Sequence, residues 1–223
     1  ELPEVETIAR NLRLGTPEQP ALIGRHFLEA CLLWERTLAE PSRGKFYKRL
    51  VGQRIETIGR RGKFLYFHLN RDWLLFHLRM SGDLCVRSAG SPHETHDRLL
   101  LVLEGDILLA FTDARKFGRI WLVNELDRVV GDLGPEPLDE VLTARKFFSR
   151  LQTTRRQLKP LLLDQSFLAG LGNIYTDEAL NLAKLHPLTP SNTLTEKQAT
   201  RLLDAIRTVL QDGISRNGAS IDW

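Results

Sequence analysis

The sequence predicts an α+β protein in which an N-terminal helix and a β-sandwich precede a C-terminal helical domain. Short apolar segments separated by turn residues fill residues 22–124, a pattern typical of many short strands. Gly131–Pro137 is rich in Gly and Pro and indicates a linker. Beyond it, apolar residues recur at helical spacing. We therefore expect a β-rich domain at 1–130, a linker at 131–142 and a helical domain at 143–223.

The N-terminal domain begins with a predicted helix at 4–13, for which Pro3 suits the first turn. Its apolar face is formed by Val5, Ile8, Ala9 and Leu12. Seven strands are then predicted, at 26–34, 53–58, 64–69, 73–78, 99–103, 107–111 and 120–123.

The C-terminal domain is predicted to contain only helices. Their ranges are 143–151, 155–163, 167–170, 176–184 and 195–213. The last has one continuous apolar stripe, and Thr195 is placed to cap its N-terminus.

Composition limits the classes of protein that the chain can belong to. The 223 residues suit one large or two small domains. The formal net charge of +3 permits nucleic-acid binding without requiring it, and each basic cluster taken alone is better explained as a solvated face. Cys31 and Cys85 lie in apolar runs, so we expect reduced core residues of a cytosolic protein and no thiolate zinc site. The sequence contains no long apolar run, so it predicts neither a membrane span nor a secretory signal.

The most informative segment is Ala169–Glu178, where Gly170 and Gly172 flank one leucine before a predicted helix. The free N–H groups at the start of such a helix suit an anion such as a phosphate, and Asn173 adds an amide donor. Spacing alone favours an ordinary turn between two helices.

This segment, with Leu163–Phe167 before it and His186-Pro187 after it, resembles the helix–two-turn–helix motif of the formamidopyrimidine-DNA glycosylase and endonuclease VIII family. Five further segments match the family in the same order: Glu1–Thr7, Arg60–Phe64, His77–Gly82, Phe111–Gly118 and Leu133–Pro137. Together they cover nearly the whole chain. The pattern favours the formamidopyrimidine branch, which recognises oxidised purines.

The resemblance implies a bifunctional N-glycosylase and AP lyase. In the family, an N-terminal proline amine forms a Schiff base with the sugar, and β- and δ-elimination follow. Glu1 matches the residue after that proline, so we expect the natural protein to begin Met-Pro-Glu. Glu1 is then the general acid/base candidate, whereas a solvated terminal residue is the alternative without the resemblance. Glu4 is a weaker candidate for the lesion pocket, because Glu4 and Glu6 also suit the positive end of the first helix.

Lys63 matches the family lysine that contacts the phosphate near the lesion and assists elimination; the alternative is a surface lysine. Met80, Arg115 and Phe117 match the residues that fill the gap left by a flipped nucleotide. An apolar wedge and a guanidinium offset the unstacking cost of flipping. The alternatives are core packing for Met80 and Phe117 and a solvated Arg115. Since Met80 lies between Arg79 and Ser81, we expect a protruding tip.

Four further residues are predicted to bind DNA. His96 matches a family phosphate contact, although a lone histidine is more often structural or a surface group. Arg155 and Lys159, with Arg156 between them, precede the helical hairpin and are expected to contact phosphates. Asn173 is the strongest candidate for a DNA contact in this half.

The function predicted from the sequence is therefore removal of 8-oxoguanine and formamidopyrimidines from duplex DNA. We expect a monomer in the bacterial cytoplasm that binds damaged double-stranded DNA and no membrane. The resemblance also implies a lesion-capping loop and a four-cysteine zinc finger after Trp223, so we expect a truncated chain with no cofactor of its own.

Two alternatives belong to other functional classes. A fragment that binds lesions or abasic DNA without cutting follows if no proline precedes Glu1. A helix–turn–helix transcription factor is disfavoured, because no basic recognition helix stands out.

Overall fold

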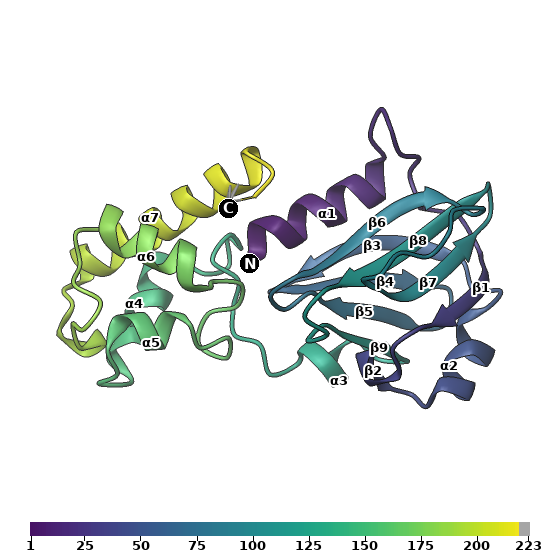
Figure 1. Ribbon diagram of the computed structural model, residues 1–223. Coiled ribbons are helices and arrows are strands. Elements are labelled where there is room, and N and C mark those ends of the chain that lie inside the picture. The colour runs from purple at the N-terminus through teal and green to yellow at the C-terminus, as the bar shows by residue number, and fades with distance from the viewer. Residues whose placement is uncertain (219–223) are drawn as a thin grey trace. The chain divides into compact units, whose positions relative to one another are not determined.

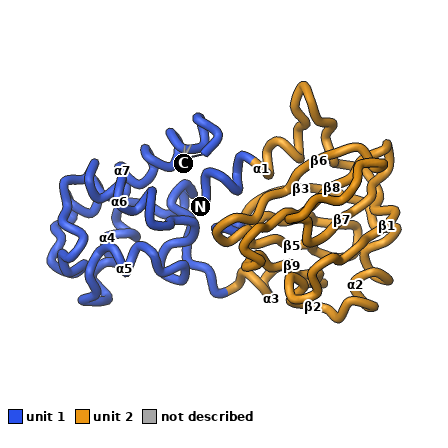
Figure 2. Tube along the Cα trace, viewed as in Figure 1, with its two compact units in different colours: residues 1–7, 61–63, 132–223 blue, residues 8–60, 64–131 orange. Residues whose placement is uncertain are grey.

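The computed structural model describes residues 1–218, which divide into two compact units (Figures 1 and 2). Unit 1 combines residues 1–7 and 61–63 with the chain from Asp132 onward, and unit 2 combines 8–60 with 64–131. The lesion-capping loop and zinc finger expected from the resemblance lie outside the described residues.

Both short segments of unit 1 were assigned by the sequence analysis to the N-terminal domain. The structure differs because Leu2 packs into the apolar core of the helices. The guanidinium of Arg61 likewise donates hydrogen bonds to the carbonyls of Leu133 and Gly134, at 3.1 and 2.7 Å. Local sequence patterns do not reveal such long-range contacts.

Unit 2 is built on two sheets. Its strands are β1 (Phe27–Leu32), β2 (Leu38–Glu40), β3 (Ile55–Arg61), β4 (Phe64–Leu69), β5 (Trp73–His77), β6 (Gly82–Ser88), β7 (Asp97–Leu103), β8 (Ile107–Asp113) and β9 (Arg119–Val123). The four-stranded sheet has the order β1-β7-β8-β6, and the five-stranded sheet has the order β2-β9-β5-β4-β3. Strand β2 pairs in parallel with β9, whereas β5 pairs antiparallel with both β4 and β9.

The two sheets face each other across an aromatic core, which confirms the predicted β-sandwich. Phe76 of β5 and Phe111 of β8 come from different sheets, and their ring centroids are 5.5 Å apart. Phe67 of β4 packs edge-on against Phe76. All three side chains are buried, and such contacts stabilise a core beyond the apolar area that they bury.

Helix α1 (Leu2–Leu14) is confirmed, and its residues from Ile8 onward belong to unit 2. Three further short elements of this unit are η1 (Glu35–Thr37), α2 (Arg43–Leu50) and α3 (Asp127–Val130). The sequence analysis missed α2, β2 and β6. Only Phe46 and Leu50 of α2, and only Leu84 of β6, are buried, so neither element shows a clear apolar period.

Unit 1 contains α4 (Ala144–Gln152), α5 (Leu158–Leu162), α6 (Asn173–Leu182), η2 (Ser191–Thr193) and α7 (Glu196–Ser215). The predicted cap of the last helix is confirmed: Thr195 Oγ1 accepts a hydrogen bond from Gln198 N at 3.3 Å, in a capping box. The helix predicted at 167–170 is wrong. Asp164 turns the chain there by accepting from Ser166 N, and Gly170 has a φ of +107°.

The cysteines are not core residues, contrary to expectation. Cys31 is exposed and Cys85 is half-buried, and neither forms a disulfide among residues 1–218. Cys31 lies on β1, where the buried Phe27 and Leu32 flank residues that face outward.

Among residues 1–218, no helix combines the length and the hydropathy that a bilayer span requires.

Candidate active site and DNA-binding residues

The carboxylate of Glu1 lies at the N-terminus of α6. It accepts hydrogen bonds from the backbone nitrogens of Gly172, Ile174 and Tyr175 at 2.7, 2.8 and 3.3 Å. Nitrogens in the first turn of a helix have no partner within the helix, and the helix dipole favours a negative charge there. The sequence analysis suggested that these nitrogens would suit a phosphate. In the structure they instead donate to the protein's own Glu1 carboxylate.

A glycine at position 172 makes this contact geometrically feasible. A Cβ atom there would lie 2.3 Å from Cδ of Glu1 and 2.5 Å from its Oε1. The φ of Gly172 is −122°, an extended conformation that any residue adopts. Close approach of the carboxylate, and not backbone conformation, is thus the reason for glycine at this position.

A second carboxylate lies beside the first. The backbone nitrogen of Glu1 is 2.7 Å from Oε2 of Glu4, and the hydroxyl of Tyr175 donates to Oε1 of Glu4 at 3.0 Å. The Glu4 side chain as a whole is 32% exposed, but its Oε2 atom is buried. Sequence reasoning did not single out Tyr175, although it belongs to the Asn-Ile-Tyr run of the helix–two-turn–helix motif.

The turn that carries Lys63 packs on the same segment as Glu1. Gly62 has a φ of +56°, and its nitrogen donates to Oε1 of Glu136 at 2.6 Å. A Cβ at Gly62 would lie 3.3 Å from Cβ of Ala169, while the nitrogen of Leu2 donates to the carbonyl of Gly170 at 3.1 Å. Unit 1 therefore brings Glu1 and the turn that carries the half-buried Lys63 onto one segment, 169–172, and Glu4 lies beside Glu1.

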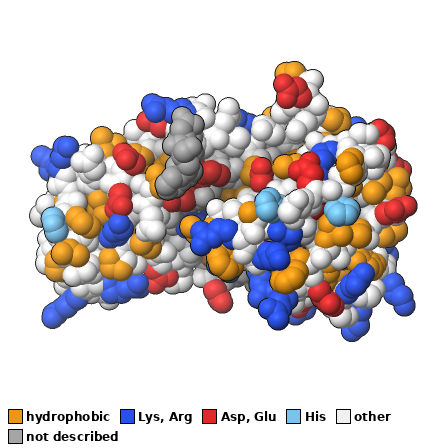
Figure 3. Space-filling view, viewed as in Figure 1, with side chains coloured by type: hydrophobic (Ala, Val, Ile, Leu, Met, Phe, Trp, Pro, Cys, Tyr) orange, Lys and Arg blue, Asp and Glu red, His pale blue; other side chains and the backbone are white. Residues whose placement is uncertain are grey.

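The predicted DNA-binding residues of the helical hairpin differ in accessibility. Asn173 begins α6 and is exposed, as is Arg155. Lys159 instead pairs with Asp177, with Nζ and Oδ2 2.7 Å apart. On the face that Figure 3 shows, Lys and Arg side chains lie over both units and do not single out one of them as the DNA-binding unit.

Arg156 also serves a structural purpose. Its guanidinium lies 2.6 Å from Asp164, and this hydrogen bond, with a second from the Ser166 hydroxyl, lowers the pKa of Asp164 to about 2. The Arg156–Asp164 ion pair therefore fixes the start of the segment that connects α5 to α6.

In unit 2, Met80 protrudes as predicted. Its side chain is 72% exposed, and that of Phe117 is 53% exposed, so core packing is wrong for both. The guanidinium carbon of Arg115 lies 5.1 Å from the ring centroid of Phe117, a cation–π arrangement. His96 is exposed in the segment that leads into β7.

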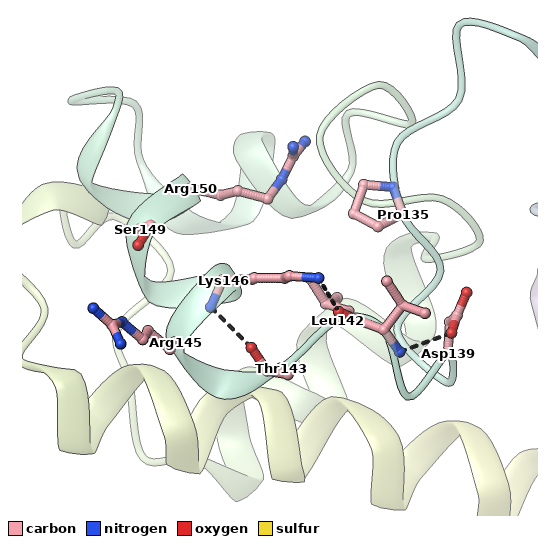
Figure 4. Close-up of a pocket in the computed structure, with 9 residues that line it drawn as sticks. Pro135, Asp139, Leu142, Thr143, Arg145, Lys146, Ser149 and Arg150 are labelled. Atoms are coloured by element: carbon pink, nitrogen blue, oxygen red, sulfur yellow. Dashed lines mark hydrogen bonds between the residues drawn. The ribbon is translucent and has the colours of Figure 1, made fainter.

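A pocket of about 600 Å³ lies beside the N-terminus of α4 in unit 1 (Figure 4). Two of its cations are already bonded to the protein, because Nζ of Lys146 donates to the carbonyl of Val141 and Arg150 donates to that of Phe167. None of the predicted site residues lines it.

Residues 1–218 contain no group of three or more His, Cys, Asp or Glu side chains arranged to hold a metal ion. The zinc implied by the resemblance thus has no ligand set in the described part of the chain.

Comparison with known proteins agrees with this fold. The sequence profile of the formamidopyrimidine-DNA glycosylase N-terminal domain matches residues 1–120, and that of its H2TH domain matches residues 133–223. The formamidopyrimidine-DNA glycosylase of Protochlamydia amoebophila is 41% identical over 99% of this chain and 79% of its own length. That of Chloroflexus aurantiacus is 44% identical over 99% of this chain and 78% of its own length.

Solved structures show the same relationship. The Lactococcus lactis formamidopyrimidine-DNA glycosylase, non-covalently bound to DNA with an AP site, has a TM-score of 0.90 and 35% identity. The match covers 98% of this chain and 83% of that one. A complex of the L. lactis enzyme with FAPY-dG-containing DNA has a TM-score of 0.90 and 36% identity over 99% and 82% of the two chains.

The β-sandwich unit and the helical unit, with the two family domains that match them, place the chain among the DNA-repair glycosylases. The chain belongs to the formamidopyrimidine-DNA glycosylase family.

Proposed function

We propose that this protein excises 8-oxoguanine and formamidopyrimidines from duplex DNA and then cleaves the abasic site by β- and δ-elimination. The proposal places the nucleophilic amine on a proline directly before Glu1. The observation that carries it is the Glu1 carboxylate, held by the backbone nitrogens of the N-cap residue Gly172 and of Ile174 and Tyr175 in the first turn of α6. Such a group is fixed beside an amine one residue away, where it serves as the acid and base of the reaction.

The remaining roles follow from position and chemistry. Glu4, oriented by Tyr175, faces the lesion base, and Lys63 contacts the phosphate beside it. Met80, Arg115 and Phe117 fill the space of the flipped nucleotide, and their exposure on turns supports this role. His96, Arg155, Lys159 and Asn173 contact the DNA backbone. Lys159 must leave or share its ion pair with Asp177 to do so.

Partner, location and cofactor form part of the same proposal. The protein acts on damaged duplex DNA as a cytoplasmic monomer, and light scattering should give the mass of a single chain. The proposed chemistry uses an amine and carboxylates and no metal.

Product analysis tests the proposal. The protein with its natural amino terminus is incubated with a duplex that contains 8-oxoguanine, and separately with a preformed abasic duplex. We expect base release and strand ends from both eliminations. Glu1→Gln should slow base release by about 10²-fold or more, the usual contribution of a general acid–base group. Gly44→Ala is the matched control, since nothing lies within 4 Å of a Cβ there.

Two outcomes would contradict the proposal. Base release without strand cleavage would show a monofunctional glycosylase. Lesion-dependent binding without either product would support the alternative, a non-catalytic protein that binds lesions or abasic DNA.

A further inference from the structure

Two turns at one end of the β-sandwich carry the exposed residues of the proposed DNA wedge. Met80 lies in the turn between β5 and β6, and Arg115 and Phe117 lie in the turn between β8 and β9 (Figure 1). Each turn crosses from one sheet to the other. The registers place them side by side, because His77 pairs with Arg119 and Gly82 pairs with Asp113.

A single buried carboxylate connects the two turns. Asp113, which is 1% exposed, accepts hydrogen bonds from the Ser81 hydroxyl and from the nitrogens of Gly118 and Arg115, the latter two at 2.7 and 3.2 Å. The Ser81 hydroxyl also accepts from the nitrogen of Arg115 at 3.2 Å. The residue next to Met80 and residues on both sides of Phe117 thus meet at one side chain.

The backbone of Asp113 is fixed as well. Its nitrogen donates to the carbonyl of His96 at 2.8 Å, and its own carbonyl accepts from Nε of Arg98 at 2.8 Å. Burial raises the pKa of Asp113, but the hydrogen bonds from Ser81, Gly118 and Arg115 outweigh it and leave the pKa below its usual value. The group is therefore an ionised acceptor at neutral pH, which strengthens each of these bonds.

Both turns also contain a strained residue next to the wedge. Arg79, before Met80, has a φ of +58°, and Lys116, between Arg115 and Phe117, has a φ of +60°. Residues other than glycine adopt this left-handed conformation only where their surroundings hold them in it. The nitrogen of Arg79 donates to Nδ1 of His77 at 3.1 Å, and that of Lys116 donates to the backbone carbonyl of Asp113 at 3.3 Å, so both residues are held in place.

We propose that Asp113 and Ser81 are positioning residues that lock the two turns together, so that Met80, Arg115 and Phe117 enter DNA as one preformed wedge. The proposal rests on the proposed function, in which these three side chains fill the space of a flipped nucleotide. A wedge that is ordered before binding loses less side-chain freedom in the complex, which favours insertion. In this proposal both residues act through the wedge and take no part in the chemical step.

The test compares Ser81→Ala with Ser88→Ala. Ser88 lies at the other end of β6, where its exposed hydroxyl donates to Asp106 at 2.7 Å, so it is a matched serine outside the network. The probe is a duplex with a tetrahydrofuran abasic site and 2-aminopurine beside it, whose fluorescence rises on unstacking. We expect Ser81→Ala to weaken binding to this duplex about tenfold, the effect of one lost hydrogen bond to a charged group. Affinity for undamaged duplex should not change.

A double-mutant cycle separates positioning from a general loss of structure. If Ser81 acts through the wedge, Ser81→Ala should have little further effect in a Met80→Ala background. Additive effects, or equal fluorescence changes for Ser81→Ala and Ser88→Ala, would overturn the proposal. If the parent protein shows no preference for the abasic duplex over undamaged DNA, the proposed function fails instead. Thermal unfolding confirms that Ser81→Ala is folded.

Discussion

Gly172→Ala tests how the structure holds the proposed acid–base group. The new methyl would lie 2.3 Å from Cδ of Glu1, while the backbone at 172 is extended and accepts alanine. Because Glu1 is the flexible partner in this contact, its carboxylate should swing away and the helix should remain. The three backbone nitrogens at the N-terminus of α6 then lose their acceptor.

The expected effects on stability and on activity differ in size. Loss of a capping carboxylate lowers the free energy of unfolding by about 1 kcal/mol, because water partly replaces the lost acceptor. Displacing a general acid–base group slows base release by about 10²-fold or more. Urea unfolding and single-turnover excision of 8-oxoguanine measure the two quantities on the same variant.

Gly44→Ala is again the control, because it fills open space in α2. It should raise the free energy of unfolding by up to about 1 kcal/mol, the helix preference of alanine over glycine, and leave excision unchanged. If Gly172→Ala retained the parent excision rate, the argument from close approach would be refuted.

Three other predictions concern recognition and stability. Tyr175→Phe removes only the hydroxyl that donates to Glu4, so it should weaken binding to a FAPY-dG duplex about tenfold and leave the affinity for a tetrahydrofuran duplex unchanged. An equal loss of affinity for both duplexes in a fluorescence titration would contradict this prediction. Because the pKa of Asp164 is lowered to about 2 in the folded protein, the stability from its pair with Arg156 should be complete above about pH 4 and disappear as the pH falls through 2. Urea unfolding across this range should show a smaller acid dependence for Asp164→Asn, and an unchanged dependence would count against the pair. Arg155→Ala should reduce the slope of log affinity against log salt by about 1, since one phosphate contact is lost; an unchanged slope would exclude that contact.

The sequence predicted features whose cause is local. Thr195 begins the last helix because its own side chain and Gln198 satisfy the first turn. Met80 protrudes because a strand ends just before it and Ser81-Gly82 follow. The alternation of apolar residues likewise predicted β4 over its full range, Phe64–Leu69.

Features that depend on distant residues could not be predicted in this way. The contact between Glu1 and Gly172 joins residues 171 positions apart, and no local pattern signals it. The link between Ser81 and Asp113 also joins two motifs that the sequence presents separately. Strand β6 was missed because its single buried residue, Leu84, gives too little alternation.

Borohydride trapping tests the central claim most directly. The protein with its natural amino terminus is mixed with an 8-oxoguanine duplex or an abasic duplex, reduced, and mapped by peptide mass spectrometry. The account predicts a covalent adduct with both duplexes, attached to an amine directly before Glu1, and a strongly reduced 8-oxoguanine adduct for Glu1→Gln. A protein that binds the abasic duplex but forms no adduct would contradict it.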